Sequence, residues 1–225
     1  MKIKQKNRKL IKDELVKRNY KTELRISENE NEGSIIEGIP IVFEQNTKMQ
    51  DWAGEYIERI DRHALDNADL RDICLFINHD TGKIALARTK NGHGTMSFFI
   101  DEEGLHIKAN LDTENNQEAR SLYSAIKRGD MNGMSFMFRI KSQEWLDLDT
   151  DCPTRVIKEI SIVHEVSVVN YPAYPQTSIN ARNSEETEYS PLAEARKAFS
   201  EEIEKKNELE IYKLKNENLL KLGGM

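Results

Sequence analysis

The chain has 225 residues, of which 38% are hydrophobic and 32% charged, and its formal net charge at pH 7 is −6. This length allows one domain with a sizeable core plus smaller appendages. The negative charge argues against general binding to nucleic acid, and no apolar run is long enough to cross a membrane. The basic N-terminus has no apolar stretch behind it that would make a signal peptide. We therefore expect neither a membrane nor a specific nucleic acid as a partner.

The two cysteines, Cys74 and Cys152, lie far apart and show neither a CxxC motif nor a Cys/His spacing. Cys74 lies in the apolar run ICLFI and is expected in the core, whereas Cys152 lies in a polar stretch. This usage is typical of a reducing, cytosolic setting. A metal site formed by His79, Asp80 and His164 is an alternative, but their spacing matches no metal-ligand motif. We expect no metal and no cofactor.

Charge divides the sequence into three segments. Residues 1–20 carry eight Lys and Arg against two acidic residues, a net of +6, and residues 183–225 carry ten Glu against seven Lys and Arg, a net of −3. The basic stretch is a candidate contact for an acidic partner, but we favour a solvated helix there. The predicted divisions are a basic N-terminal segment at 1–22, a central domain at 23–182, and a linker with a charged amphipathic helix at 183–225.

Short apolar runs separated by turn residues fill the central domain and indicate a fold dominated by strands. One internal helix is predicted at 116–130, where Ala119, Leu122 and Ile126 recur at helical spacing and Gly129 is placed to end it. Strands with one inserted helix favour an antiparallel barrel or sandwich with helical decoration, an α+β fold. The expected strands are 34–43 (a strand pair or a bulged strand), 72–80, 84–89, a hairpin at 94–111, the run that begins at Met134, and 156–170.

A long Glu/Lys-rich helix is predicted after the polar linker. Ser190 is placed to cap its N-terminus, with Pro191 at the first helical position and Gly223 at its end. A single helix cannot bury its own apolar stripe. It either docks on the central domain or pairs with a partner, and the sequence leaves both open.

The run GDMNGMSFMFRI, residues 129–140, places a serine between two large apolar side chains. From Met134 the residues alternate, with Met134, Phe136 and Phe138 on one face and Ser135 on the other. On this stretch alone, a strand with one small polar residue on its less buried face is favoured over a nucleophile. A serine becomes a nucleophile only with a base in hydrogen-bond reach, itself oriented by a third group.

Two further residues are candidates for those roles. His79 lies where the apolar run CLFI ends, which places an imidazole at the mouth of the core; a locally hydrogen-bonded strand-end histidine is the alternative. Glu165 interrupts a β-branched strand, where a buried carboxylate costs several kcal/mol unless it is paired; a solvent-facing position is the alternative. The remaining histidines read as a solvated helix position (His63), a loop residue (His93) and an exposed strand position (His106).

Five segments in this order carry a resemblance: FINHD, DEEGLHIKANLDTE, AIKRGDMNGMSFMFRI, a Trp at 145, and HEVSVVNYPAYPQT. Together they resemble the prohead (procapsid maturation) serine proteases of tailed bacteriophages, which are related in fold to the herpesvirus assemblins. The resemblance runs from about Glu23 to Thr177. It implies an assemblin-like, mainly antiparallel barrel and a catalytic triad of His79, Ser135 and Glu165.

The resemblance also implies a function. The chain is expected to be a serine endopeptidase that cleaves scaffold or capsid-protein extensions, and itself, inside the phage procapsid in the host cytoplasm. Its expected partners are the major capsid protein and the scaffold, with self-association through the C-terminal helix. The alternative is an inactive structural or scaffolding protein on the same barrel.

Assemblins use a second histidine as the third triad member, and His164 adjoins Glu165. Adjacent strand residues point to opposite faces, so only one of the two can face His79 in a regular strand. Asp80 follows His79 directly and is better placed to bond its own backbone in the turn DTGK. We predict that Glu165 orients His79.

Overall fold

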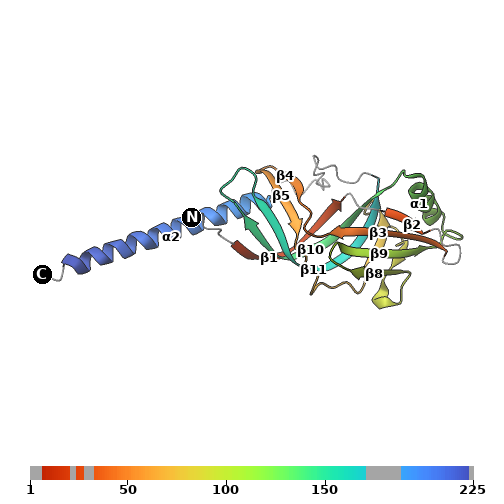
Figure 1. The fold of residues 1–225 in the computed structure, drawn as a ribbon, viewed down its shortest axis with the longest axis horizontal. Helices are drawn as coiled ribbons and strands as arrows, with labels where there is room; N and C mark the ends of the chain where they lie inside the picture. The colour runs from red at the N-terminus through yellow and green to blue at the C-terminus, as the bar shows by residue number, and fades with distance from the viewer. Residues whose placement is uncertain (1–6, 21–23, 28–32, 171–188, 223–225) are drawn as a thin grey trace.

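Two β-sheets form the centre of the fold, with a short helix beside them and a long helix at the C-terminus (Figure 1). The computed structural model describes residues 7–20, 24–27, 33–170 and 189–222. Its elements are β1 (Asn7–Tyr20), β2 (Leu24–Ser27), β3 (Ser34–Val42), β4 (Thr47–Asp51), β5 (Gly54–Ile60), β6 (Cys74–Ile77), β7 (Ala87–Arg88), β8 (Met96–Ile100), β9 (Gly104–Leu111), α1 (Gln117–Arg128), β10 (Gly133–Leu146), β11 (Thr154–Val169) and α2 (Pro191–Leu222), with a 3₁₀ turn at Lys90–Gly92.

The larger sheet is built on the long antiparallel pair β10 and β11. Its strands run in the order β1-β10-β11-β5-β4, and β6 and β7 join at the other end of β11. The first residues of β11, Thr154–Ile157, pair in parallel with β5, and its last residues, Glu165–Val168, pair in parallel with β6. One strand therefore carries a different neighbour at each end, and β6 is the neighbour that matters for the site.

The smaller sheet has the order β2-β3-β9-β8 and closes over the main core. Its β8–β9 hairpin is the one predicted at 94–111, and β3 is bulged between Gly38 and Ile41 as the sequence suggested. Phe136 and Phe138 of β10 are fully buried in this core and stack with ring centroids 4.5 Å apart. The apolar face of β10 therefore anchors the strand whose other face carries Ser135.

Helix α1 forms where its caps and apolar spacing predict it. Asn116 caps the N-terminus by accepting hydrogen bonds from two backbone amides, and Gly129 ends the helix with a left-handed φ of 79°. Ala119, Leu122 and Ile126 are all buried. The prediction of this helix is confirmed.

Helix α2 docks by its first turns only. Ser190 caps it, accepting from the Ala193 amide at 2.9 Å and donating to Asp51 at 2.7 Å. Leu192 is fully buried in a second apolar cluster, and Phe199 packs at its margin. That cluster also contains Met49, Tyr56, Trp145 and Leu148.

From Ser200 onward the described side chains of α2 are exposed, and the helix projects away from the sheets (Figure 1). The beginning of the helix therefore docks on the sheets. Pairing with a partner stays a prediction for the remainder of the helix. Among the described residues, no helix is long and apolar enough to cross a membrane.

The α+β, strand-rich class and the C-terminal helix are confirmed. In the strand pairing of the described residues, both sheets are open paths. The expectation of a solvated N-terminal helix was wrong, because Asn7–Tyr20 forms β1 and pairs with β10 along most of its length. Pairing with β10 satisfies the backbone hydrogen-bonding groups of this segment. A solvated helix of charged residues would have no tertiary packing to stabilise it. The predicted domain divisions near residues 22 and 182 lie outside the described residues and stay predictions.

Candidate active site

The structure brings Ser135, His79 and Glu165 together from three elements of the larger sheet. Ser135 lies on β10 directly opposite Ser167 of β11, and Glu165 lies two residues before Ser167 on the same strand. Parallel pairing of β6 with the end of β11 delivers His79, two residues beyond β6, to the same place. The convergence thus depends on a pairing between strands about ninety residues apart in the sequence.

The three side chains form one hydrogen-bonded chain. Ser135 Oγ lies 2.5 Å from His79 Nε2, and His79 Nδ1 lies 2.5 Å from Glu165 Oε1. Both distances are those of strong hydrogen bonds. Ser135 and Glu165 are buried, while 13% of the His79 side chain is exposed. The order is that of a nucleophile, a base and an orienting carboxylate.

The strand-end conformation of His79 turns its ring toward Ser135. His79 has a φ of 60° and the preceding Asn78 a φ of 51°, both in the left-handed region that non-glycine residues adopt at some energetic cost. The Asn78 side chain accepts a hydrogen bond from the Asn170 amide at 3.1 Å, which ties this turn to the end of β11. The turn is therefore held by the strand that supplies Glu165.

Ser167 supports both partners of this contact, and the sequence analysis did not assign it a role. Its Oγ donates to Glu165 Oε2 at 2.6 Å and accepts from the His79 backbone amide at 3.1 Å. One hydroxyl thus fixes the second carboxylate oxygen and the backbone of His79. The signal was its position two residues after Glu165 in a strand, which places both side chains on one face.

Glu165, rather than His164 or Asp80, makes the contact with His79. The register of β11 against β10 shifts between Val163 and Glu165, so a β-bulge falls at His164. The Asp80 carboxylate lies 3.9 Å from Lys83 Nζ.

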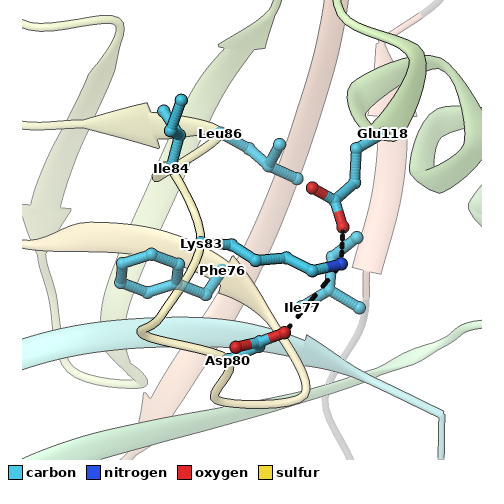
Figure 2. Close-up of a pocket in the computed structure, with 7 residues that line it drawn as sticks. All are labelled: Phe76, Ile77, Asp80, Lys83, Ile84, Leu86 and Glu118. Carbon is cyan, nitrogen blue, oxygen red and sulfur yellow. Dashed lines mark hydrogen bonds and ion pairs between the residues drawn. The ribbon is translucent and has the colours of Figure 1, made fainter.

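Figure 2 shows how the loop after His79 is fastened. Lys83 reaches between the carboxylates of Asp80 and Glu118, and Glu118 belongs to the first turn of α1. The small hollow beside this loop is lined by Phe76, Ile77, Asp80, Lys83, Ile84, Leu86 and Glu118. None of the three candidate catalytic residues lines this hollow. We therefore interpret the contacts of Lys83 as support for the loop and not as part of the candidate active site.

Comparison with known proteins identifies the family of the chain. The sequence profile described as "Caudovirus prohead serine protease" matches residues 21–190. The chain belongs to this family. It is 30% identical over 164 residues to the "Prohead protease" of Enterobacteria phage HK97, a match that covers 72% of this chain and 66%, just under two thirds, of that protein. No solved structure matches the chain.

The other titratable residues considered from the sequence lie outside this family's candidate triad. His63 is exposed and pairs with Asp66 at 3.1 Å, in a turn rather than the expected helix. His106 stacks on Phe99 with ring centroids 4.4 Å apart. Cys74 is half-buried rather than in the core. No group of three or more His, Cys, Asp or Glu side chains in the described part of the chain is arranged to hold a metal ion.

A second polar cluster, which we call the ion network, lies within the larger sheet and consists of Glu14, Arg18, Glu58, Gln143 and Arg155. Arg18 binds Glu58 through two nitrogens, Nε to one carboxylate oxygen and Nη2 to the other at 2.8 Å. Arg155 contacts Glu58 at 3.2 Å, Glu14 at 2.7 Å and Gln143 at 2.6 Å. Glu58 and Arg155 are fully buried, and nothing in the sequence alone marked them.

The ion network holds its charges firmly. Burial raises the pKa of Glu58, but attraction and hydrogen bonds from Arg18 and Arg155 outweigh it and leave the pKa below its ordinary value. Burial lowers the pKa of Arg18, yet Glu58 more than compensates and the pKa is raised. Burial next to Glu58 raises the pKa of Tyr56 to about 12. These groups stay in one charge state over the whole physiological pH range.

Proposed function

We propose that this chain is a serine endopeptidase of phage procapsid maturation, with Ser135 as nucleophile, His79 as general base and Glu165 as the carboxylate that orients His79. The observation that carries the proposal is the continuous hydrogen-bonded chain from Ser135 through His79 to Glu165 in a member of the prohead serine protease family.

The chemistry follows from the roles of these atoms. His79 Nε2 takes the Ser135 proton as Oγ attacks the scissile carbonyl carbon, and Glu165 stabilises the imidazolium through Nδ1. The imidazolium then gives its proton to the leaving amine, which leaves an ester on Ser135. A water molecule, activated by His79 in the same way, hydrolyses the ester and restores the hydroxyl.

The substrates we propose are extensions of the major capsid protein and of the scaffold, and the chain itself, inside the procapsid in the host cytoplasm. Family membership and the name of the HK97 relative support this choice. The assemblin-like barrel belongs to the same proposal. An inactive scaffolding protein on this fold is the less favoured function, because it has no use for a Ser-His-Glu arrangement held at hydrogen-bond distances.

The test is co-expression of the chain with its cognate major capsid protein, followed by mass spectrometry of the capsid protein. Wild type should yield a shortened product and Ser135→Ala should yield none. An intact capsid protein in both cases, with the wild-type chain folded, would contradict the proposed substrate. The same product from both would contradict the nucleophile.

A further inference from the structure

Strand β1 occupies the edge of the larger sheet beside the candidate nucleophile. It pairs antiparallel with β10, and Asn19 lies directly opposite Ser135. Without β1, β10 would itself be the edge strand and would present free backbone groups next to Ser135. An extended peptide binds such an edge by adding a strand. β1 therefore lies where a substrate peptide would have to pair.

The contact between β1 and Ser135 resembles that of a bound substrate. Ser135 Oγ lies 2.9 Å from the backbone carbonyl oxygen of Arg18. The peptide group between Arg18 and Asn19 thus lies next to the nucleophile and presents its carbonyl oxygen to the Ser135 hydroxyl. Ser135 has no exposed surface in this arrangement, so no other peptide can reach it while β1 is in place.

The same contact keeps the hydroxyl from acting. Ser135 has one hydroxyl proton, and the Arg18 carbonyl and His79 Nε2 both lie within hydrogen-bond distance of its oxygen. A proton donated to Arg18 is not available to His79, so the base cannot take it. The arrangement with β1 in place is therefore an occupied and restrained state of the site.

The Arg18 side chain shows what a substrate would place there. The residue whose carbonyl meets the nucleophile lies on the acyl side of the scissile bond, and in β1 this residue is an arginine. Its guanidinium forms a two-nitrogen contact with Glu58, which is fully buried. Only a guanidinium can make this contact with two nitrogens. A lysine ammonium can still neutralise the charge of Glu58 through a single contact.

Charge balance allows β1 to leave this position. β1 contributes one negative and one positive group to the ion network, Glu14 and Arg18. The groups that stay behind, Glu58 and Arg155, still form an ion pair at 3.2 Å. Release of β1 thus leaves no isolated buried charge. Breaking a buried ion pair is usually costly because one charge is left behind without a partner. The family match begins at residue 21, directly after β1.

We propose that β1 takes the place of a substrate strand and that Glu58 selects peptides with Arg or Lys on the acyl side of the scissile bond. This inference rests on the proposed function, in which Ser135 is the nucleophile. β1 must leave β10 before such a peptide can bind.

The experiment uses two phosphonate esters that react covalently with an activated serine and differ only in the side chain next to phosphorus. One carries an amidinophenyl group, which is basic, and the other a phenyl group. Rates of Ser135 modification are measured by mass spectrometry on the full chain. Wild type should react at least about tenfold faster with the basic reagent, since a buried charged partner discriminates strongly.

Two variants and one control test separately the position of β1 and the selection by Glu58. Arg18→Ala weakens the hold on β1 and should accelerate both reagents about tenfold or more. Lys17→Ala is the matched control, because Lys17 is the adjacent basic residue of β1 and its side chain is exposed; its rates should equal those of wild type. Glu58→Gln should bring the two reagents to within about threefold of each other.

A wild-type chain that reacts equally with both reagents, or faster with the phenyl reagent, overturns the selection by Glu58 even if Glu58→Gln does not fold. Unchanged rates in Arg18→Ala overturn the placement of β1 in the substrate position. Modification that persists in Ser135→Ala, or that is absent from every variant, contradicts the proposed function and this inference with it.

Discussion

Two buried polar clusters both draw residues from strands β10 and β11, and they differ in what their protons can do. In the candidate triad, each contact joins groups that can exchange a proton, and His79 keeps a partly exposed ring. In the ion network, two guanidinium groups face two carboxylates, and Arg155 and Glu58 have no exposed surface. One cluster is built for proton movement and the other for fixed charge.

The difference follows from residue type and from access to water. An imidazole changes its charge near neutral pH, whereas a guanidinium does not lose its proton in a protein. Arg18 takes part in both clusters, its side chain in the ion network and its carbonyl at Ser135. Changes in the triad should therefore alter rates with little loss of stability, whereas loss of Arg155 from the ion network should lower stability with little loss of rate.

The largest effect is expected from Ser135→Ala, which removes the nucleophile and should lower peptide hydrolysis by at least about 10⁴-fold. The melting temperature should stay close to that of wild type. Ser142→Ala is the matched control, since it removes a buried hydroxyl from the same strand and should retain hydrolysis. Hydrolysis by Ser135→Ala at the wild-type rate would show that Ser135 is not the nucleophile and that the candidate triad has no catalytic role.

Glu165→Gln should lower kcat about 10³-fold with KM little changed, because a neutral amide neither stabilises the imidazolium nor fixes the tautomer of His79. His164→Gln, one residue away, should lower kcat only a few-fold. Steady-state kinetics on a peptide substrate distinguishes the two variants. The opposite ranking would show that the protein uses a second histidine in place of the carboxylate.

Arg155→Met should destabilise the fold by about 3 kcal/mol, because it removes the ion pair of Glu14 with Arg155 and leaves Glu58 with Arg18 alone. Denaturant unfolding followed by fluorescence measures this loss. The catalytic rate of the folded fraction should not fall. A large loss of kcat at full folding would show that Arg155 acts in catalysis as well as in stability.

Ser167→Ala should lower kcat by about tenfold, a smaller effect than Glu165→Gln, because Ser167 acts only by holding Glu165 and the backbone of His79. Ser167→Thr keeps the hydroxyl and should recover part of the rate. The pH–rate profile of Ser167→Ala should also shift along the pH axis. Loss of stability with an unchanged profile would indicate a purely structural role.

The smallest effect concerns acid stability. The pKa of Glu58 lies below its ordinary value in the folded chain, because burial, which raises it, is outweighed by Arg18 and Arg155. The stabilisation from this group is complete above the ordinary pKa of 4.5 and is lost as the pH falls through the lowered pKa. The difference in unfolding free energy between wild type and Glu58→Gln should therefore shrink below pH 4.5. A constant difference would mean that Glu58 is not ionised in the fold.

The resemblance of five ordered segments to a known family predicted Ser135, His79 and Glu165 as the candidate site, whereas local pattern alone only marked them as candidates. Ser135 and Glu165 each interrupt a strand-forming apolar stretch, and His79 ends one. Helix α1 carries its own caps within its sequence, so no distant contact was needed to predict it. Ser167 was harder to assign, because a serine in a strand is common and its role depends on two partners.

The ion network and β1 could not be predicted in the same way. Glu58 and Arg155 lie in strands where charged residues read as solvent-facing, and they are buried only because β5 pairs in parallel with the beginning of β11. Half of the residues of β1 are charged, and their partner strand begins more than a hundred residues later. Non-local pairing decides burial in both cases, and the local sequence pattern does not report it.

The pairing of β1 with β10 also sets the order in which a newly made chain can complete its structure. The end of β1 and the start of β10 are separated by 133 − 20 = 113 residues. At ribosomal elongation rates this corresponds to roughly 6 to 23 s between the synthesis of the two strands. During that interval β1 has no β10 to pair with, and neither polar cluster has all of its members. The nascent chain therefore cannot have an assembled site until β11 is made, and β1, which is made before the other described strands, is among the last to find its place.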